Sequence, residues 1–168
     1  MIELKPLSRE AIPAALEKAM RYRLLGEPAD AESICHDILA VEPDHQEALV
    51  TLLLALTDQF DGEEARRALH EAAEVLPRLR GDYERAYYSG LVAERRARAH
   101  LRRAGPGAAA AAGEWLREAM AWYERAEALR PPGNDDAILR WNACARMLLR
   151  HPHLQPPAPE PVDTTFLE

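Results

Sequence analysis

Three short segments contain residue types that could carry chemistry. His151 and His153 could offer two ring nitrogens to a metal ion, but no third ligand lies close in the sequence, and histidine is common at helix C-termini. The segment GPGAAAAAG, residues 105–113, has the glycines of a phosphate-binding loop. It lacks the following Lys and Ser/Thr that contact phosphate and magnesium, and no strand precedes it. The sequence therefore predicts neither a metal site nor a nucleotide site.

The other nucleophilic and titratable residues do not assemble into a catalytic set. Cys35 and Cys144 each lie inside an apolar helical pattern, which favours reduced, packed thiols. A disulfide between them stays open, because the geometry of the pair decides it. The remaining histidines are scattered along the chain: His36, His45, His70 and His100. We therefore expect no enzyme activity and no cofactor.

Composition indicates helices and a protein that avoids nucleic acid. The 168 residues suit one domain, and Ala, Leu, Glu and Arg dominate, whereas the β-branched residues that favour strands are sparse. The formal net charge of −7 repels a phosphate backbone. The N-terminal residues show no secretory leader, and no segment reaches the roughly 18 apolar residues of a membrane span. These features predict a cytoplasmic protein with no nucleic-acid or membrane partner.

Apolar spacing and chain breaks predict seven helices. An N-terminal segment, residues 1–11, precedes them, and a proline-rich tail, residues 151–168, follows as an extended or flexible segment. The expected helices cover approximately residues 8–25, 28–41, 45–59, 63–76, 81–103, 109–130 and 134–150.

One set of offsets recurs three times among these helices. Alanine is followed by apolar or aromatic residues four and seven positions later and by proline twelve positions later. The second set lies 34 residues after the first, and the third lies 54 residues after the second. The three sets are Ala31, Cys35, Ile38 and Pro43; Ala65, Leu69, Ala72 and Pro77; and Ala119, Tyr123, Ala126 and Pro131. A small residue lets a partner helix approach, and the proline ends the helix, so the pattern predicts stacked helix pairs.

At these residues the sequence resembles the tetratricopeptide repeat (TPR) family, whose period is 34 residues. Ala19 and Gly90 match the small position of the family's first helix. The resemblance implies an all-α fold, a right-handed α-solenoid of three helix hairpins with a C-terminal capping helix. The hairpins would span residues 12–45, 46–79 and 80–133, the third with lengthened helices, and the cap would span residues 134–150.

The resemblance also implies a protein–protein interaction module, such as an adaptor, scaffold or chaperone. The first helices of such hairpins line a concave groove, and here that face is mostly apolar. The expected groove residues are Leu16, Met20, Val50, Leu54, Tyr87, Leu91, Ile138 and Asn142. Apolar residues at these positions do not support the family's Lys/Asn clamp for a partner's C-terminal carboxylate. The groove is expected to bind an apolar helix or strand of a protein or peptide partner.

Three further interpretations remain open at the level of sequence. The groove residues could be core, or the chain's own end could fill the groove through Phe166 and Leu167. The helical repeats could instead build a structural subunit of a homo-oligomer or larger complex. Arginines of the long fifth helix could form a basic patch for an acidic protein surface or, locally, for RNA, or they could simply form a solvated helix face. The patch residues are Arg95, Arg98, Arg102 and Arg103.

Overall fold

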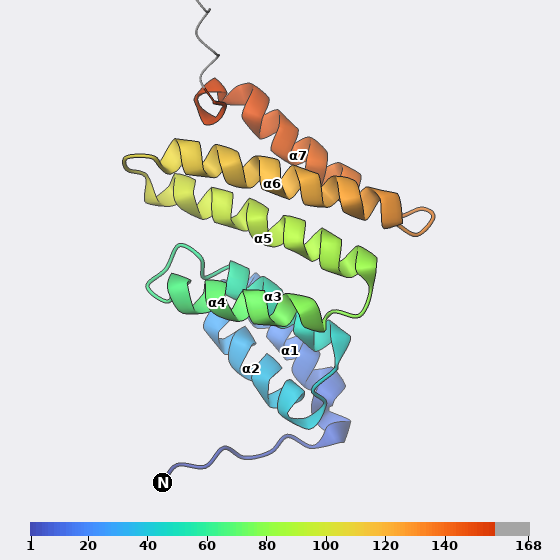
Figure 1. Ribbon diagram of the computed structural model, residues 1–168. Coiled ribbons are helices and arrows are strands. Elements are labelled where there is room, and N and C mark those ends of the chain that lie inside the picture. Colours follow the sequence, from blue (N-terminus) through green and yellow to red (C-terminus); the bar gives the residue numbers. More distant parts are fainter. Residues whose placement is uncertain (157–168) are drawn as a thin grey trace, which may run out of the picture.

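The computed structural model describes residues 1–156, and the predicted all-α class is confirmed there: these residues form seven α-helices and no strand (Figure 1). The α-helices are α1 (Ile12–Leu24), α2 (Pro28–Val41), α3 (Gln46–Thr57), α4 (Ala65–Val75), α5 (Asp82–Arg103), α6 (Ala108–Leu129) and α7 (Asp136–Arg150). Three 3-10 turns accompany them: η1 (Arg9–Ala11), η2 (Leu76–Arg78) and η3 (Pro152–Leu154). No helix among residues 1–156 has the length and apolarity needed to cross a membrane.

The helices gather around two apolar cores. We call residues 9–79, which contain α1–α4, the N-terminal block, and residues 82–154, which contain α5–α7, the C-terminal block. Within each block every helix packs on the next one in the chain, and α1 also contacts α3. The long helices α5 and α6 lie side by side over most of their length (Figure 1).

Large aliphatic side chains fill the N-terminal block. The segment LVTLLLAL makes α3 apolar nearly all round, and α3 is accordingly covered by α1, α2 and α4. Its leucines at positions 49, 52, 53 and 56 are at most 1% exposed. The side chain of His45 begins this helix by accepting a hydrogen bond from the Ala48 amide at 3.2 Å, which satisfies one free donor of the first turn.

Small residues set the spacing of the C-terminal block. Gly90 on α5 lies against the ring of Tyr123 on α6, and a Cβ at Gly90 would meet ring carbons at 2.7 and 2.8 Å. Alanines continue this seam, with Ala97, Ala112 and Ala119 fully buried. The absence of larger side chains lets the two long helices approach closely enough to enclose the Tyr123 ring.

Residues just after α7 fold back onto α6. Leu154 in η3 is 1% exposed, and its carbonyl lies directly over Gly113. Gln155 donates from Nε2 to the Leu148 carbonyl at 3.1 Å. The packed chain therefore extends past residue 150, where the sequence pattern placed the start of a flexible tail. Phe166 and Leu167, the expected docking residues of that tail, lie outside the described residues.

The two blocks meet along α5. Ala99 belongs to the apolar core of the N-terminal block, and Tyr88 and Val92 pack against the same core. Near the end of α5, Arg102 pairs with Asp61, and Arg103 donates to the Phe60 carbonyl. Helix α5 is thus shared by both blocks and fixes the position of α3 relative to α6.

Candidate functional site

An apolar pocket of about 400 Å³ lies between α1, α3 and the first turns of α5. Each helix supplies residues spaced four apart, which places them on one helical face. The apolar part of the lining is Met20, Leu24, Val50, Leu54, Leu79 and Tyr88. Met20 and Leu24 are 52% and 85% exposed, so the pocket opens to solvent along α1. Large apolar side chains left exposed around a concavity are typical of a binding surface.

Three of the eight expected groove residues line this pocket: Met20, Val50 and Leu54. Leu16 and Leu91 are instead buried, at 7% and 6% exposed. Ile138 and Asn142 are partly buried on α7, away from the pocket lining. The structure therefore brings together Met20 of α1 with Val50 and Leu54 of α3.

Tyr87 belongs to an aromatic stack beside the pocket. Its ring centroid lies 5.8 Å from that of Tyr83, 5.1 Å from that of Tyr88 and 5.9 Å from that of Tyr123. Burial, with a smaller effect of Asp136, raises the pKa of Tyr87 to about 12. Tyr88, the next residue, lines the pocket, whereas the expected groove residue on this helix was Tyr87. Because Tyr87 and Tyr88 are adjacent, the sequence does not show which of the two faces the pocket, and the packing of α5 decides it.

The four expected patch arginines are engaged with groups of the chain itself. Arg95 Nη1 donates to Asp58 at 3.2 Å, and Arg98 bonds Glu94 at 2.9 and 3.1 Å. Arg102 and Arg103 hold Asp61 and the Phe60 carbonyl. The structure therefore distributes these arginines over separate partners and does not bring them together as one free basic surface.

A buried carboxylate, Glu94, joins the three helices of the C-terminal block. Its side chain is 0% exposed and accepts hydrogen bonds from Tyr123 on α6 at 2.8 Å and from Arg140 on α7 at 2.5 and 3.0 Å, besides those from Arg98 on α5. Burial alone would lower the pKa of Arg140, but the charge and hydrogen bonds of Glu94 raise it above its ordinary value. Burial, the charge of Glu94 and its hydrogen bond raise the pKa of Tyr123.

Sequence reasoning missed this carboxylate. Glu94 stands in a run of charged residues, ERRAR, that reads as a solvated helix face. A signal was present, because Glu94 lies four residues after Gly90 and three before Ala97, both buried small residues of the same helix. The spacing places Glu94 on the inner face, but the partner Arg140 lies 46 residues away and no local pattern predicts it.

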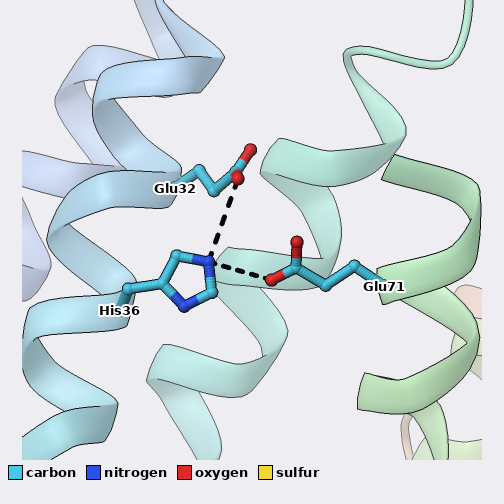
Figure 2. A group of neighbouring side chains, drawn as sticks. All are labelled: Glu32, His36 and Glu71. Atoms are coloured by element: carbon cyan, nitrogen blue, oxygen red, sulfur yellow. Dashed lines mark ion pairs between the residues drawn. The ribbon is translucent and has the colours of Figure 1, made fainter. Parts of the chain in front are cut away.

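A second polar cluster links α2 to α4 (Figure 2). His36 Nε2 lies 2.9 Å from Glu71 Oε1 and 3.8 Å from Glu32 Oε1. Within residues 1–156 these three side chains form the one group of three or more His, Cys, Asp or Glu close enough to share a cation. His151 and His153, with ring centroids 5.6 Å apart, have no such third member in the part of the chain that the structure describes.

The two thiols are unpaired and buried. Cys35 in α2 and Cys144 in α7 are 0% and 1% exposed. Burial, reinforced by the nearby charges of Glu32 and Glu94 respectively, raises the pKa of each thiol to about 12. A thiol in this state is a packing residue and not a nucleophile.

Comparison of the chain with protein-family models, with curated proteins and with solved structures gave no match.

Proposed function

We propose that the chain is a non-catalytic interaction module of the tetratricopeptide kind, and that the pocket between α1, α3 and α5 holds an apolar segment of a partner protein. The observation that carries this proposal is the pocket itself, because it is apolar, open to solvent and built by three helices that the repeat pattern makes the first helices of successive hairpins. Its size fits a few apolar side chains of a helix or strand, as in helix-in-groove recognition.

The pocket also offers polar groups that could orient such a segment. Glu47 and Glu84 lie on its edge, and neither makes an ion pair within the described residues. Arg23, also in the lining, is already held by Asp58 at 2.7 Å. A partner segment would therefore place apolar anchors against Val50, Leu54 and Tyr88 and expose its polar face to solvent. This role is that of an adaptor, scaffold or chaperone in the cytoplasm.

Selection from a displayed library of random peptides would test the proposal. We expect the wild-type chain to enrich peptides with two or three apolar anchors, and the variant Val50→Glu/Leu54→Glu to lose their binding at least tenfold, because each change buries a carboxylate against the ligand. Leu129→Glu is the matched control, since Leu129 is 51% exposed on α6 and does not line the pocket. Peptides that bind the double variant and the wild type equally would overturn the proposal.

Self-association through α7 is a second candidate. Leu139 and Leu149 of α7 are 64% and 74% exposed, on the helix that ends the sequence of packed helices. A structural subunit that assembles through this surface would be an oligomer whose mass, measured by light scattering after size exclusion, falls on Leu139→Glu/Leu149→Glu. A monomeric wild-type chain would rule out self-association and leave the adaptor role as the remaining candidate.

A further inference from the structure

The cluster of Glu32, His36 and Glu71 has the residue types and spacing of a three-ligand cation site. Glu32 and His36 are four residues apart on α2 and face the same side, and Glu71 reaches them from α4 of the next helix pair (Figure 2). One ligand atom from each residue lies within 4.8 Å of the others. Tetrahedral zinc with bonds of about 2.0–2.2 Å places its ligand atoms roughly 3.3–3.6 Å apart. The observed separations of 2.9 and 3.8 Å from His36 Nε2 lie on either side of that range.

The charges around the cluster favour a dication. Three carboxylates, those of Glu32, Glu64 and Glu71, converge on the single guanidinium of Arg67, at 2.6, 3.1 and 3.0 Å. These three carboxylates and one guanidinium leave two negative charges unbalanced in this network.

Neighbouring polar groups already orient the would-be ligands. Gln59 Nε2 donates to Glu32 Oε2 at 2.6 Å, and Arg67 donates to Glu71 Oε2 at 3.0 Å, which leaves Glu71 Oε1 directed at His36. Such outer contacts fix the geometry of metal ligands. Arg67 Nη1 also bonds Glu32 Oε1, so the guanidinium and a cation would share this carboxylate. His36 is half exposed, which gives an entry path from solvent.

We propose that Glu32, His36 and Glu71 bind one divalent transition-metal cation of the zinc class, with water completing its coordination. A nitrogen and two carboxylate oxygens match the donor preference of zinc, whereas calcium prefers oxygen alone. The cation joins α2 to α4, two helices that do not line the apolar pocket. Its role is to fasten the two helix pairs of the N-terminal block together, independently of any partner in the pocket.

Calorimetric titration of the full chain with zinc chloride, in a buffer that does not chelate zinc, tests this site. We expect one zinc per chain, a rise in the melting temperature with zinc, and a loss of affinity of at least about tenfold in Glu71→Gln and in His36→Gln. His70→Ala is the matched control, because His70 lies on α4 one residue from Glu71, is exposed, and pairs only with Glu74, at 3.5 Å.

Circular dichroism without zinc is the control for folding. Each variant should give the spectrum of a folded chain, because the substituted side chains lie at a partly exposed edge. The proposal is overturned if the wild type binds no zinc, if His36→Gln and Glu71→Gln bind it as the wild type does, or if His70→Ala loses it too. It is also overturned if calcium binds equally well and His36→Gln leaves that binding unchanged, since oxygen ligands alone would then hold the ion.

Discussion

The N-terminal block packs leucines and isoleucines around α3, whereas the C-terminal block packs alanines, a glycine and one carboxyl side chain between two helices of 22 residues each. In the first block the polar network of Glu32, Arg67 and Glu71 lies at the edge, with Arg67 41% exposed. In the second block Glu94 lies at the centre and is fully buried. We therefore expect the stability of the first block to be spread over many apolar contacts, and that of the second block to depend strongly on the hydrogen bonds of Glu94.

The strongest test of this contrast is Glu94→Ala. Removal of the carboxylate leaves Arg98, Arg140 and the Tyr123 hydroxyl facing one another without their shared acceptor. Since both arginines keep about a third of their side chains in solvent, we expect a loss of about 3 kcal/mol in the free energy of unfolding, at the lower end for a broken buried pair. Urea unfolding would measure it.

The chain offers a way to locate that loss. All three tryptophans, Trp115, Trp122 and Trp141, lie in α6 and α7, so their fluorescence follows the C-terminal block, while far-UV circular dichroism follows all helices. In Glu94→Ala the fluorescence transition should come at lower urea than the dichroism transition. Glu74→Ala, which removes only an exposed contact with His70, should change the free energy by less than about 0.5 kcal/mol. A loss below 1 kcal/mol in Glu94→Ala would contradict the contrast.

Gly113→Ala should detach η3 from the C-terminal block. A Cβ there would lie 1.8 Å from the Leu154 carbonyl oxygen, and a backbone atom cannot yield unless η3 moves away. Exposure of Leu154 should lower the free energy of unfolding by about 2 kcal/mol, whereas the higher helix propensity of alanine should raise it by about 1 kcal/mol. We therefore expect a net decrease of about 1 kcal/mol.

Hydrogen exchange is the direct readout of that detachment. The amides of Leu154 and Gln155, which bond the carbonyls of His151 and Pro152, should lose protection in Gly113→Ala. Glu114→Ala, one residue further along α6 and exposed, is the control that should leave them protected. Unchanged protection in Gly113→Ala would mean that η3 does not depend on the close approach at residue 113.

Much of the fold could be predicted because its signals are local. Prolines after α2 and α6, glycines in the turns and apolar spacing of about 3.6 residues mark the seven helices within a few residues of their observed bounds. The repeated small positions also carry physical information, since Gly90 does lie where a side chain would strike Tyr123. The helix boundaries depend on residues that are near one another in the chain, and the small positions are marked by their regular recurrence.

The site could be predicted only in part, because pairing over long distances has no local signal. Met20, Val50 and Leu54 were expected in the groove from the register of the tetratricopeptide resemblance, but whether Tyr87 or Tyr88 faces the pocket depends on how α5 rotates against the first core. The arginines of α5 read as a surface patch because their partners Asp58 and Asp61 lie 37 and 41 residues earlier. The return of Leu154 to Gly113 was missed for the same reason.

A smaller effect is expected from acid on the edge network of the N-terminal block. The pKa of Glu32 is lower in the folded chain than in the unfolded chain, so the unfolded state takes up the proton first as the pH falls. Its stabilisation is complete above the ordinary glutamate pKa and is lost as the pH falls through the folded value. Because Arg67 is 41% exposed, we expect no more than about 1 kcal/mol.

Comparison of the wild type with Glu32→Gln isolates this contribution. The wild type should be the more stable of the two at pH 7, and the difference should shrink at pH 3, as measured by urea unfolding at each pH. A difference that does not change with pH would show that Glu32 acts through packing and not through its charge.

The smallest effect is expected where the two blocks meet. Burial, offset in part by Asp58, lowers the pKa of Arg95, whose Nε has no hydrogen-bond partner within the described residues. Asp58 keeps its 2.7 Å bond to Arg23 when Arg95 is replaced. Arg95→Met removes a partly buried charge, which is unfavourable to desolvate, together with one 3.2 Å bond, so the free energy of unfolding should change by less than about 0.5 kcal/mol.

Arg140→Met is the variant with which the unfolding free energy of Arg95→Met should be compared. The same substitution on α7 removes two of the bonds to Glu94 and leaves a buried carboxylate with less compensation, so a loss of about 3 kcal/mol is expected. Equal losses in the two variants would show that the junction depends on its arginine as strongly as the C-terminal block does. Unequal losses, with Arg95→Met near zero, would mean that apolar contacts of Tyr88, Val92 and Ala99 hold the blocks together.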